Sequence, residues 1–133
     1  MSTPRILVID DDAAHLISAK AILEEEGYEV FTHYRSFGST QVAATLLPDL
    51  ILLDVNMPGL SGEELAQIFS QEPRTRRIPL VFYSSNDEDT LRTAVAKFGT
   101  LGYISKGNPV HLRLRVAELL RRTSALAAAT API

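Results

Sequence analysis

Two short aliphatic runs of this chain end in carboxylates. Asp54 comes directly after the run Leu50–Leu53, and a triplet, Asp10–Asp12, follows Ile6–Ile9. Unbroken aliphatic runs are typical of strands that are buried on both faces, as in a parallel sheet between helices. Ligands bind to such sheets at the carboxyl edge, where these acids would lie. Aspartate is also common in turns and as a helix cap, but one residue is enough for either role.

Carboxylates gathered at one edge repel one another. The repulsion amounts to a few kcal/mol per close pair at an effective dielectric of about 20, and a divalent cation is the simplest compensation. Oxygen ligands at an open site suit Mg²⁺, with Mn²⁺ as the alternative, better than they suit zinc. The spacing of the aspartates therefore predicts a site for one of these ions.

A hydroxyl and a lysine follow two further predicted strands. Ser84 comes after Leu80–Tyr83, and Lys106 comes after Gly102–Ser105. Each has an ordinary interpretation, as a strand-end hydroxyl and as a solvated lysine. Opposite carboxylates, however, an ammonium can hold an acid or an anion. Together with Asp54 and a hard metal, these groups are the parts of phosphoryl transfer onto aspartate, in which catalysis is mostly positioning and charge neutralisation.

The elements that must position these side chains alternate between strand and helix five times. Tyr28–His33 completes the set of predicted strands, and its alternating polarity is typical of a strand near a sheet edge. Strand–helix–strand connections require parallel strands and right-handed crossovers, so we expect an α/β fold with a three-layer open sheet. Apolar residues at helical spacing predict the five helices: Leu16, Ala19, Ile22 and Leu23; Val42, Ala43, Leu46 and Leu47; Leu65, Ile68 and Phe69; Leu91, Ala94, Val95 and Phe98; and Leu112, Val116, Leu119 and Leu120.

Start and stop signals mark most of these helices. Ser61 and Glu64 have the form of a capping box, and Asn108 followed by Pro109 is typical of an N-cap and a first helical position. Gly27 and Gly99 are natural helix ends. The helix that precedes Pro48 has the least defined start.

Composition limits the remaining possibilities. The 133 residues fit one domain, which buries roughly two-thirds of its unfolded surface. The absence of cysteine excludes disulfides and cysteine catalysis. A net charge of −3 gives no general attraction to nucleic acid or anionic lipid. Two groups of arginines are typical of a solvated face: Arg74, Arg76 and Arg77 before the strand at 80, and Arg113, Arg115, Arg121 and Arg122 on the last helix. Without a signal segment or an apolar stretch near 20 residues, we expect a cytoplasmic protein with no membrane insertion.

Four motifs, in this order, resemble the receiver domain of two-component response regulators. They are Ile-Asp-Asp-Asp ending at residue 12, Leu-Leu-Asp-Val-Asn-Met-Pro-Gly-Leu-Ser-Gly ending at residue 62, Ser84-Ser85, and Gly-Tyr-Ile-Ser-Lys ending at residue 106. The resemblance covers residues 4–122 and implies a doubly wound, flavodoxin-like (βα)₅ fold with the strand order 2-1-3-4-5. Residues 123–133 would be an Ala-rich tail or the start of a linker.

The resemblance implies a role for each edge residue. Asp54 would be the phosphoacceptor, and Asp10 and Asp11 would hold Mg²⁺ with it. The backbone carbonyl of Asn56 would complete the protein ligands. Asp12 would be a helix cap or an outer-sphere helper.

The other implied residues concern the phosphoryl group and the switch. Ser84 and Lys106 would bind the phosphoryl oxygens, and Tyr103 would turn inward when Ser84 moves. Asn56 and Asn86 lie where family members tune the rate of dephosphorylation. Gly107 departs from the family, whose members usually have a proline after the lysine, commonly in a cis peptide.

The function implied is that of a phosphorylation-dependent signalling switch. A histidine kinase or phosphotransfer protein would donate the phosphoryl group, and the domain would catalyse its own slow dephosphorylation, without acting as an enzyme on other substrates. A downstream protein would contact the side made by the last two helices and the strand at 102–105, with no direct binding of nucleic acid; a homodimer through those helices stays open.

The alternative is a degenerate receiver that acts as an unphosphorylated interaction module, for which Gly107 is the only support. A haloacid dehalogenase-type phosphatase would need an acid where Asn56 stands.

Overall fold

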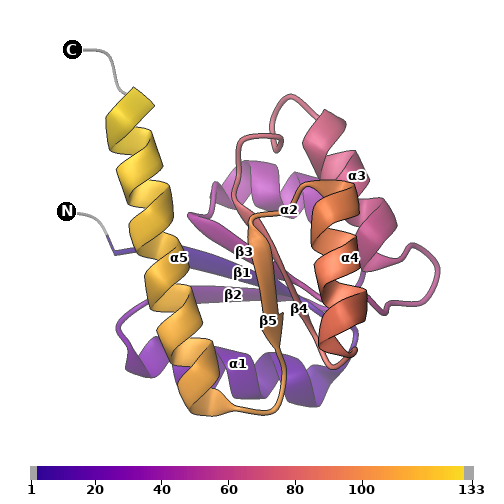
Figure 1. Cartoon of the computed structure of the whole chain (residues 1–133), viewed down its shortest axis with the longest axis horizontal. Coiled ribbons are helices and arrows are strands. Elements are labelled where there is room, and N and C mark those ends of the chain that lie inside the picture. Colours follow the sequence, from indigo (N-terminus) through magenta and orange to yellow (C-terminus); the bar gives the residue numbers. More distant parts are fainter. Residues whose placement is uncertain (1–2, 131–133) are drawn as a thin grey trace.

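Five parallel strands form a single sheet in this protein (Figure 1). The computed structural model describes the backbone of residues 3–130 and the side chains of residues 3–124. The order across the sheet is β2-β1-β3-β4-β5, which confirms the strand order that the resemblance implied. The strands are β1 (Arg5–Ile9), β2 (Glu29–His33), β3 (Leu50–Leu53), β4 (Leu80–Ser84) and β5 (Gly102–Ser105).

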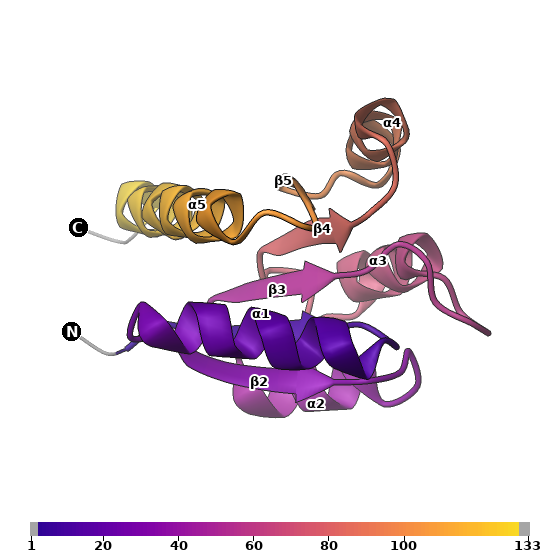
Figure 2. The same cartoon turned by 90° about the horizontal axis from the view of Figure 1, so that it is seen from below.

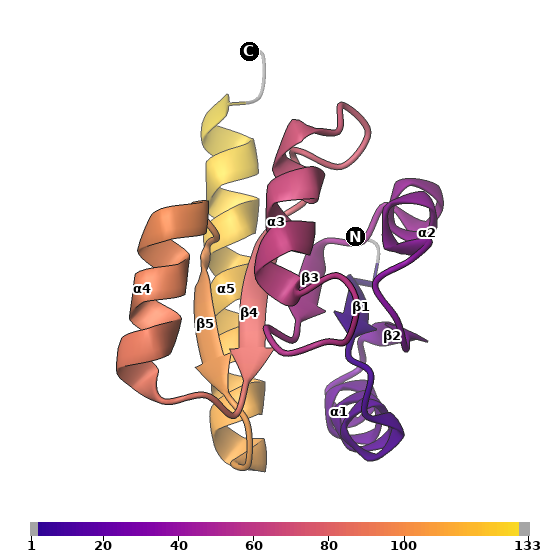
Figure 3. The same ribbon diagram turned by 90° about the vertical axis from the view of Figure 1, so that its right-hand side faces the viewer.

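Helices cover both faces of this sheet. Figures 2 and 3 show α1 and α5 on one face and α2, α3 and α4 on the other, which makes the three layers expected from the alternating pattern. The helices are α1 (Ala13–Glu25), α2 (Ser39–Leu46), α3 (Gly62–Gln71), α4 (Glu88–Phe98) and α5 (Pro109–Thr130).

The core is divided in two by the sheet. Ile6 and Val8 of β1 pack with α1 and α5, whereas Leu7 and Ile9 of the same strand pack with the helices on the opposite face. Because successive side chains of a strand point to opposite faces, a strand buried on both sides must be apolar throughout, as β1 and β3 are. The edge strand β2 is less buried, as its predicted edge position requires: Val30 and Phe31 are covered on opposite faces, whereas Glu29 and Thr32 are exposed.

Helix starts follow the predicted caps. Ser61 accepts a hydrogen bond from the Glu64 backbone N–H, and the Glu64 carboxylate accepts one from the Ser61 N–H, which completes the capping box of α3. Asp12 caps α1, since its Oδ1 accepts from the backbone N–H of Ala14 and of His15. Asp12 therefore performs the capping role that was one of its two expected roles.

Two side chains that were expected on apolar stripes are exposed. Ile68 is 38% exposed because the buried side of α3 is centred on Leu65, Ala66 and Phe69. Leu47 is 63% exposed and lies beyond the end of α2, with a positive φ of 49°. A left-handed residue ends the helix before Pro48 and turns the chain toward β3, and this turn directs the Leu47 side chain away from the core.

The last helix extends further than the predicted domain. α5 continues to Thr130, past residue 122, and residues 131–133 lie outside the described part of the chain. The division into a domain and a tail at residue 122 stays a prediction. None of the helices in residues 3–130 is long and apolar enough to cross a membrane.

Candidate functional site

Four neighbouring strands bring the expected site residues to one edge of the sheet. Asp10 follows β1, Asp54 follows β3, Ser84 ends β4 and Lys106 follows β5. Backbone hydrogen bonds hold the strand ends together: the N–H of Asp54 donates to the carbonyl of Ile9 at 3.0 Å, and that of Lys106 donates to Ser84 at 2.9 Å. The strand pairing thus continues to the residues that carry the chemistry.

Three carboxylates converge at this edge. Asp10, Asp11 and Asp54 each offer an oxygen, and these oxygens all lie within 4.8 Å of one another. Asp10 is fully buried and Asp54 is 6% exposed, whereas Asp11 is exposed. The cluster is therefore open on one side, and its donor set of hard oxygens fits a divalent cation of the Mg²⁺ type.

The Lys106 side chain crosses from β5 toward β1 and is only 7% exposed. Its Nζ lies 2.5 Å from Asp10 Oδ2 and 3.5 Å from Asp54 Oδ2. One ammonium thus faces two buried carboxylates and balances part of their charge.

The environment of Asp54 disfavours its charged form. Burial raises the pKa of Asp54, the nearby Lys106 ammonium lowers it, and the Asp10 carboxylate raises it again, with a net increase. The backbone N–H of Asn56 donates to Asp54 Oδ1 at 3.3 Å, which also favours the carboxylate. A carboxylate with a raised pKa is a stronger base, and an incoming cation or ammonium would stabilise it more than it would a solvated one.

A hydroxyl and two amides form the opposite side of the site. Ser84 is fully buried, and its Oγ accepts from the backbone N–H of Asn86 at 3.3 Å. The Asn56 side-chain Nδ2 donates to Asn86 Oδ1 at 2.7 Å, so the residues two positions after Asp54 and Ser84 are joined directly. This bridge lies beside the phosphoacceptor candidate.

His15 is a site residue that the sequence did not reveal. Its Nδ1 lies 2.9 Å from Lys106 Nζ and 3.4 Å from Asp10 Oδ2. The available signal was its position in the first turn of α1, three residues after the N-cap Asp12, because this turn begins at the end of β1. Nothing in the sequence, however, indicates that a lysine 91 residues away would reach it.

Gly62 lies directly against the backbone of Asp54. A Cβ at this position would overlap the backbone carbonyl of Asp54, and the Gly62 N–H donates to the Val55 carbonyl at 2.9 Å. The start of α3 thus packs directly against the backbone of the phosphoacceptor candidate, and only glycine leaves room for it.

The structure also places the switch candidate and the unusual glycine. Tyr103 is half-buried on β5 and packs with the core cluster on the α4 side of the sheet. Gly107 has a φ of +103°, and residues 3–130 contain no cis peptide bond. Because proline requires a φ near −65°, the loop after Lys106 follows a path that a proline at residue 107 would not allow.

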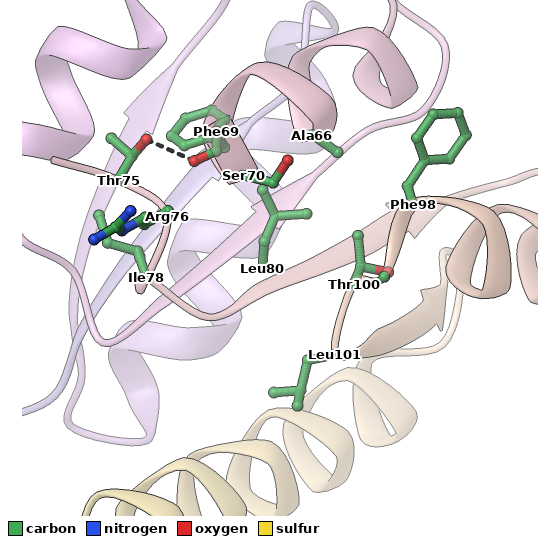
Figure 4. A pocket seen from close by; sticks show the side chains of 11 residues that line it. Ala66, Phe69, Ser70, Thr75, Arg76, Ile78, Leu80, Phe98, Thr100 and Leu101 are labelled. Atoms are coloured by element: carbon green, nitrogen blue, oxygen red, sulfur yellow. Dashed lines mark hydrogen bonds between the residues drawn. The ribbon is translucent and has the colours of Figure 1, made fainter. Parts of the chain in front are cut away.

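A small cavity of about 80 Å³ lies away from this site, near the start of β4 and the ends of α3 and α4 (Figure 4). Its walls include Phe69, Leu80 and Phe98, and the Thr75 hydroxyl beside it donates to the Phe69 carbonyl at 2.9 Å. No carboxylate lines it. The groups suited to phosphoryl chemistry therefore gather at the carboxyl edge of the sheet and not in this cavity.

Comparison with known proteins yields the same family by sequence and by structure. The family model of the response regulator receiver domain matches residues 6–117. The phosphate regulon transcriptional regulatory protein PhoB of Rhizobium meliloti (strain 1021) is 34% identical over 120 residues, which cover 90% of this chain and 53% of PhoB. Response regulator PleD of Caulobacter vibrioides (strain NA1000 / CB15N) is 37% identical over 118 residues, or 88% of this chain and 26% of PleD.

The chain spans about half the length of PhoB and a smaller share of PleD. Among solved structures, a response regulator receiver domain protein (CheY-like) from Methanospirillum hungatei JF-1 superposes with a TM-score of 0.79 at 29% identity, over 93% of this chain and 98% of that one. The match of the family model to most of the chain, the strand order and the acidic edge agree, and the chain belongs to the response regulator receiver domain family.

Proposed function

We propose that this receiver domain is a phosphorylation-dependent signalling switch in which Asp54 is the phosphoacceptor. The observation that carries the proposal is the position of the Asp54 carboxylate, which is buried at an otherwise open edge, 3.5 Å from the Lys106 ammonium. A histidine kinase or a phosphotransfer protein would be the donor.

The chemistry is a displacement at phosphorus. An Asp54 Oδ atom attacks the phosphorus, a new O–P bond forms, and the P–N bond of a donor phosphohistidine breaks, with its electron pair returning to the imidazole nitrogen. Lys106 and the Ser84 hydroxyl bind the phosphoryl oxygens. Asp10, Asp11 and Asp54, with the backbone carbonyl of Asn56, would hold Mg²⁺ or Mn²⁺, which supplies neutralisation of negative charge at the reacting centre.

The output is a shift between two conformations. A phosphoryl dianion at Asp54 stabilises the state in which Ser84 and Lys106 reach it, and a change in occupancy from 1:99 to 99:1 needs a difference of about 5.5 kcal/mol. Movement of Ser84 on β4 would be transmitted to Tyr103, since β4 and β5 are paired and Tyr103 lies opposite Phe82. The α4–β5–α5 side would then be the surface that a downstream protein recognises.

An unphosphorylated interaction module is the weaker alternative. The altered loop at Gly107 is its only support, whereas the acids, the hydroxyl and the lysine needed for phosphoryl transfer are all at the edge of the sheet. We therefore favour the phosphoacceptor function.

The test is intact mass spectrometry after incubation with acetyl phosphate, with and without Mg²⁺. We expect the wild-type domain to gain one phosphoryl group only with Mg²⁺, and Asp54→Ala to gain none. The matched control is Asp89→Ala, which removes an exposed aspartate on α4 and should leave the gain unchanged. No gain in the wild type, under conditions that modify another receiver domain, would leave the interaction module as the better account.

A further inference from the structure

The Lys106 ammonium lies over the Tyr83 ring and close to three polar side-chain atoms. Asp10 Oδ2 lies at 2.5 Å, His15 Nδ1 at 2.9 Å and Asp54 Oδ2 at 3.5 Å. Two of these partners are carboxylates that belong to the proposed cation and phosphoryl site. The third is an imidazole, which belongs to neither set.

The contact with Lys106 assigns a role to one ring nitrogen of His15. An ammonium can only donate, so Nδ1 is the acceptor in this contact, which leaves Nε2 as the ring nitrogen that carries a proton. Nε2 faces Asp12 Oδ2 at 3.7 Å, and the His15 backbone N–H donates to Asp12 Oδ1 at 3.3 Å. Asp12 thus holds the His15 backbone while it caps α1, and its second carboxylate oxygen lies on the Nε2 side of the ring.

We infer that His15 is a positioning residue that holds the Lys106 ammonium beside the phosphoacceptor; this inference rests on the proposed phosphorylation of Asp54. A lysine side chain is long and flexible, and its head group is useful only if it is held within reach of the phosphoryl oxygens. His15 Nδ1 provides an acceptor outside the carboxylate cluster, which stays available when Asp10 is engaged with a cation.

A histidine on an exposed helix is usually solvated, and the His15 side chain is 44% exposed. The ring atom that faces inward, however, contacts a lysine that is almost fully buried. The opposite role would be an inhibitory one, in which the same contact holds Lys106 back from Asp54. An effect of that sign would make the reaction faster when His15 is removed, so the direction of the rate change distinguishes the two roles.

The variants follow from the geometry. His15→Leu removes the acceptor and keeps an apolar side chain, whereas His15→Asn places an amide oxygen at the position of Nδ1, one bond from Cγ. His111→Leu is the matched control, because His111 lies on α5 and its imidazole makes no hydrogen bond or ion pair among the described residues; the contact with Asn108 is made by its backbone N–H. The melting temperature of each variant shows whether it is folded.

The first readout is the ammonium signal of Lys106 by ¹H–¹⁵N NMR in the resting domain without Mg²⁺. The chain contains only three lysines, Lys20, Lys97 and Lys106, so the signal can be assigned by substitution. We expect His15→Leu to shift the Lys106 signal and to accelerate its hydrogen exchange with water at least fivefold, because a hydrogen bond to a charged group is lost. His15→Asn should restore slow exchange, and His111→Leu should change nothing.

The second readout is the maximal rate of phosphorylation by acetyl phosphate at saturating Mg²⁺. We expect His15→Leu to lower it about tenfold, with no recovery at higher Mg²⁺, and His15→Asn to stay within about threefold of the wild type. An unchanged or faster rate in His15→Leu, or an unchanged Lys106 ammonium signal, would overturn the inference while the proposed function stands. A wild-type domain that accepts no phosphoryl group would overturn both.

Discussion

Replacing Lys106 with methionine removes the ammonium that faces two buried carboxylates while it keeps most of the side-chain stem. At an effective dielectric of about 20, the attraction lost amounts to about 7 kcal/mol toward Asp10 at 2.5 Å and about 5 kcal/mol toward Asp54 at 3.5 Å. These gross values overstate the effect, because burial of the ammonium has a desolvation cost of several kcal/mol that the variant no longer bears.

Protonation of one buried carboxylate limits how much stability Lys106→Met can lose. The variant can neutralise one carboxylate by protonation, which at pH 7 costs about 4 kcal/mol for an acid with the usual pKa of about 3.9. Asp54 is the group that takes the proton, since burial already raises its pKa. We therefore expect the free energy of unfolding to fall by about 3 kcal/mol at pH 7.

The pH dependence follows from the same reasoning. A carboxyl whose pKa is raised in the folded state destabilises the fold as pH rises above the unfolded value, because the native state keeps a proton that the unfolded state has lost. The loss of stability in Lys106→Met should thus shrink by up to about 1.4 kcal/mol per pH unit as the pH is lowered, to about 1 kcal/mol at pH 5.

Urea unfolding of the wild type and Lys106→Met at pH 5, 6 and 7 without Mg²⁺ measures both quantities. Lys20→Met, which removes an exposed lysine on α1, is the matched control and should change the free energy of unfolding by less than about 0.5 kcal/mol. A loss below about 1 kcal/mol at pH 7, or one that does not vary with pH, would refute the view that Lys106 compensates the two buried carboxylates.

Three further outcomes can be measured by urea unfolding. Asp54→Asn should raise the free energy of unfolding at pH 7, because it removes a carboxylate whose charged form burial disfavours. The gain should disappear as the pH approaches the ordinary aspartate pKa of about 3.9. A gain that grows on acidification would contradict a raised pKa for Asp54. Gly62→Ala should lower stability by about 3 kcal/mol and reduce phosphorylation, since its Cβ overlaps the Asp54 carbonyl; a neutral effect would mean that the loop accommodates a side chain. Leu47→Gly should raise stability by about 1 kcal/mol, as glycine adopts a φ of 49° without the Cβ penalty and little buried surface is lost; a loss would mean that the exposed leucine makes a contact that matters.

Elements that depend on residues close together in the chain were predictable from the sequence. The strands around Ile6–Ile9 and Leu50–Leu53 are buried on both faces, which requires apolar residues throughout and leaves an unbroken run in the sequence. The capping box at Ser61 and Glu64 and the helix end at Gly99 are equally local. The strand order and the roles of the acidic residues came from the family resemblance, because no local pattern says which strands pair.

The remaining features depend on residues that are far apart in the chain. His15 and Lys106 are separated by 91 residues and meet only because β5 and the start of α1 reach the same edge of the sheet. Asn56 and Asn86, which are 30 residues apart, meet in the same way, because the loops that follow the paired strands β3 and β4 lie side by side. The exposure of Ile68 was also decided by packing, since periodicity identifies a helix stripe but not how far the neighbouring elements cover it. The sequence thus determined which residues can carry the chemistry, and the tertiary structure decided which of them touch, because contacts at the sheet edge are set by strand order and side-chain reach rather than by spacing along the chain.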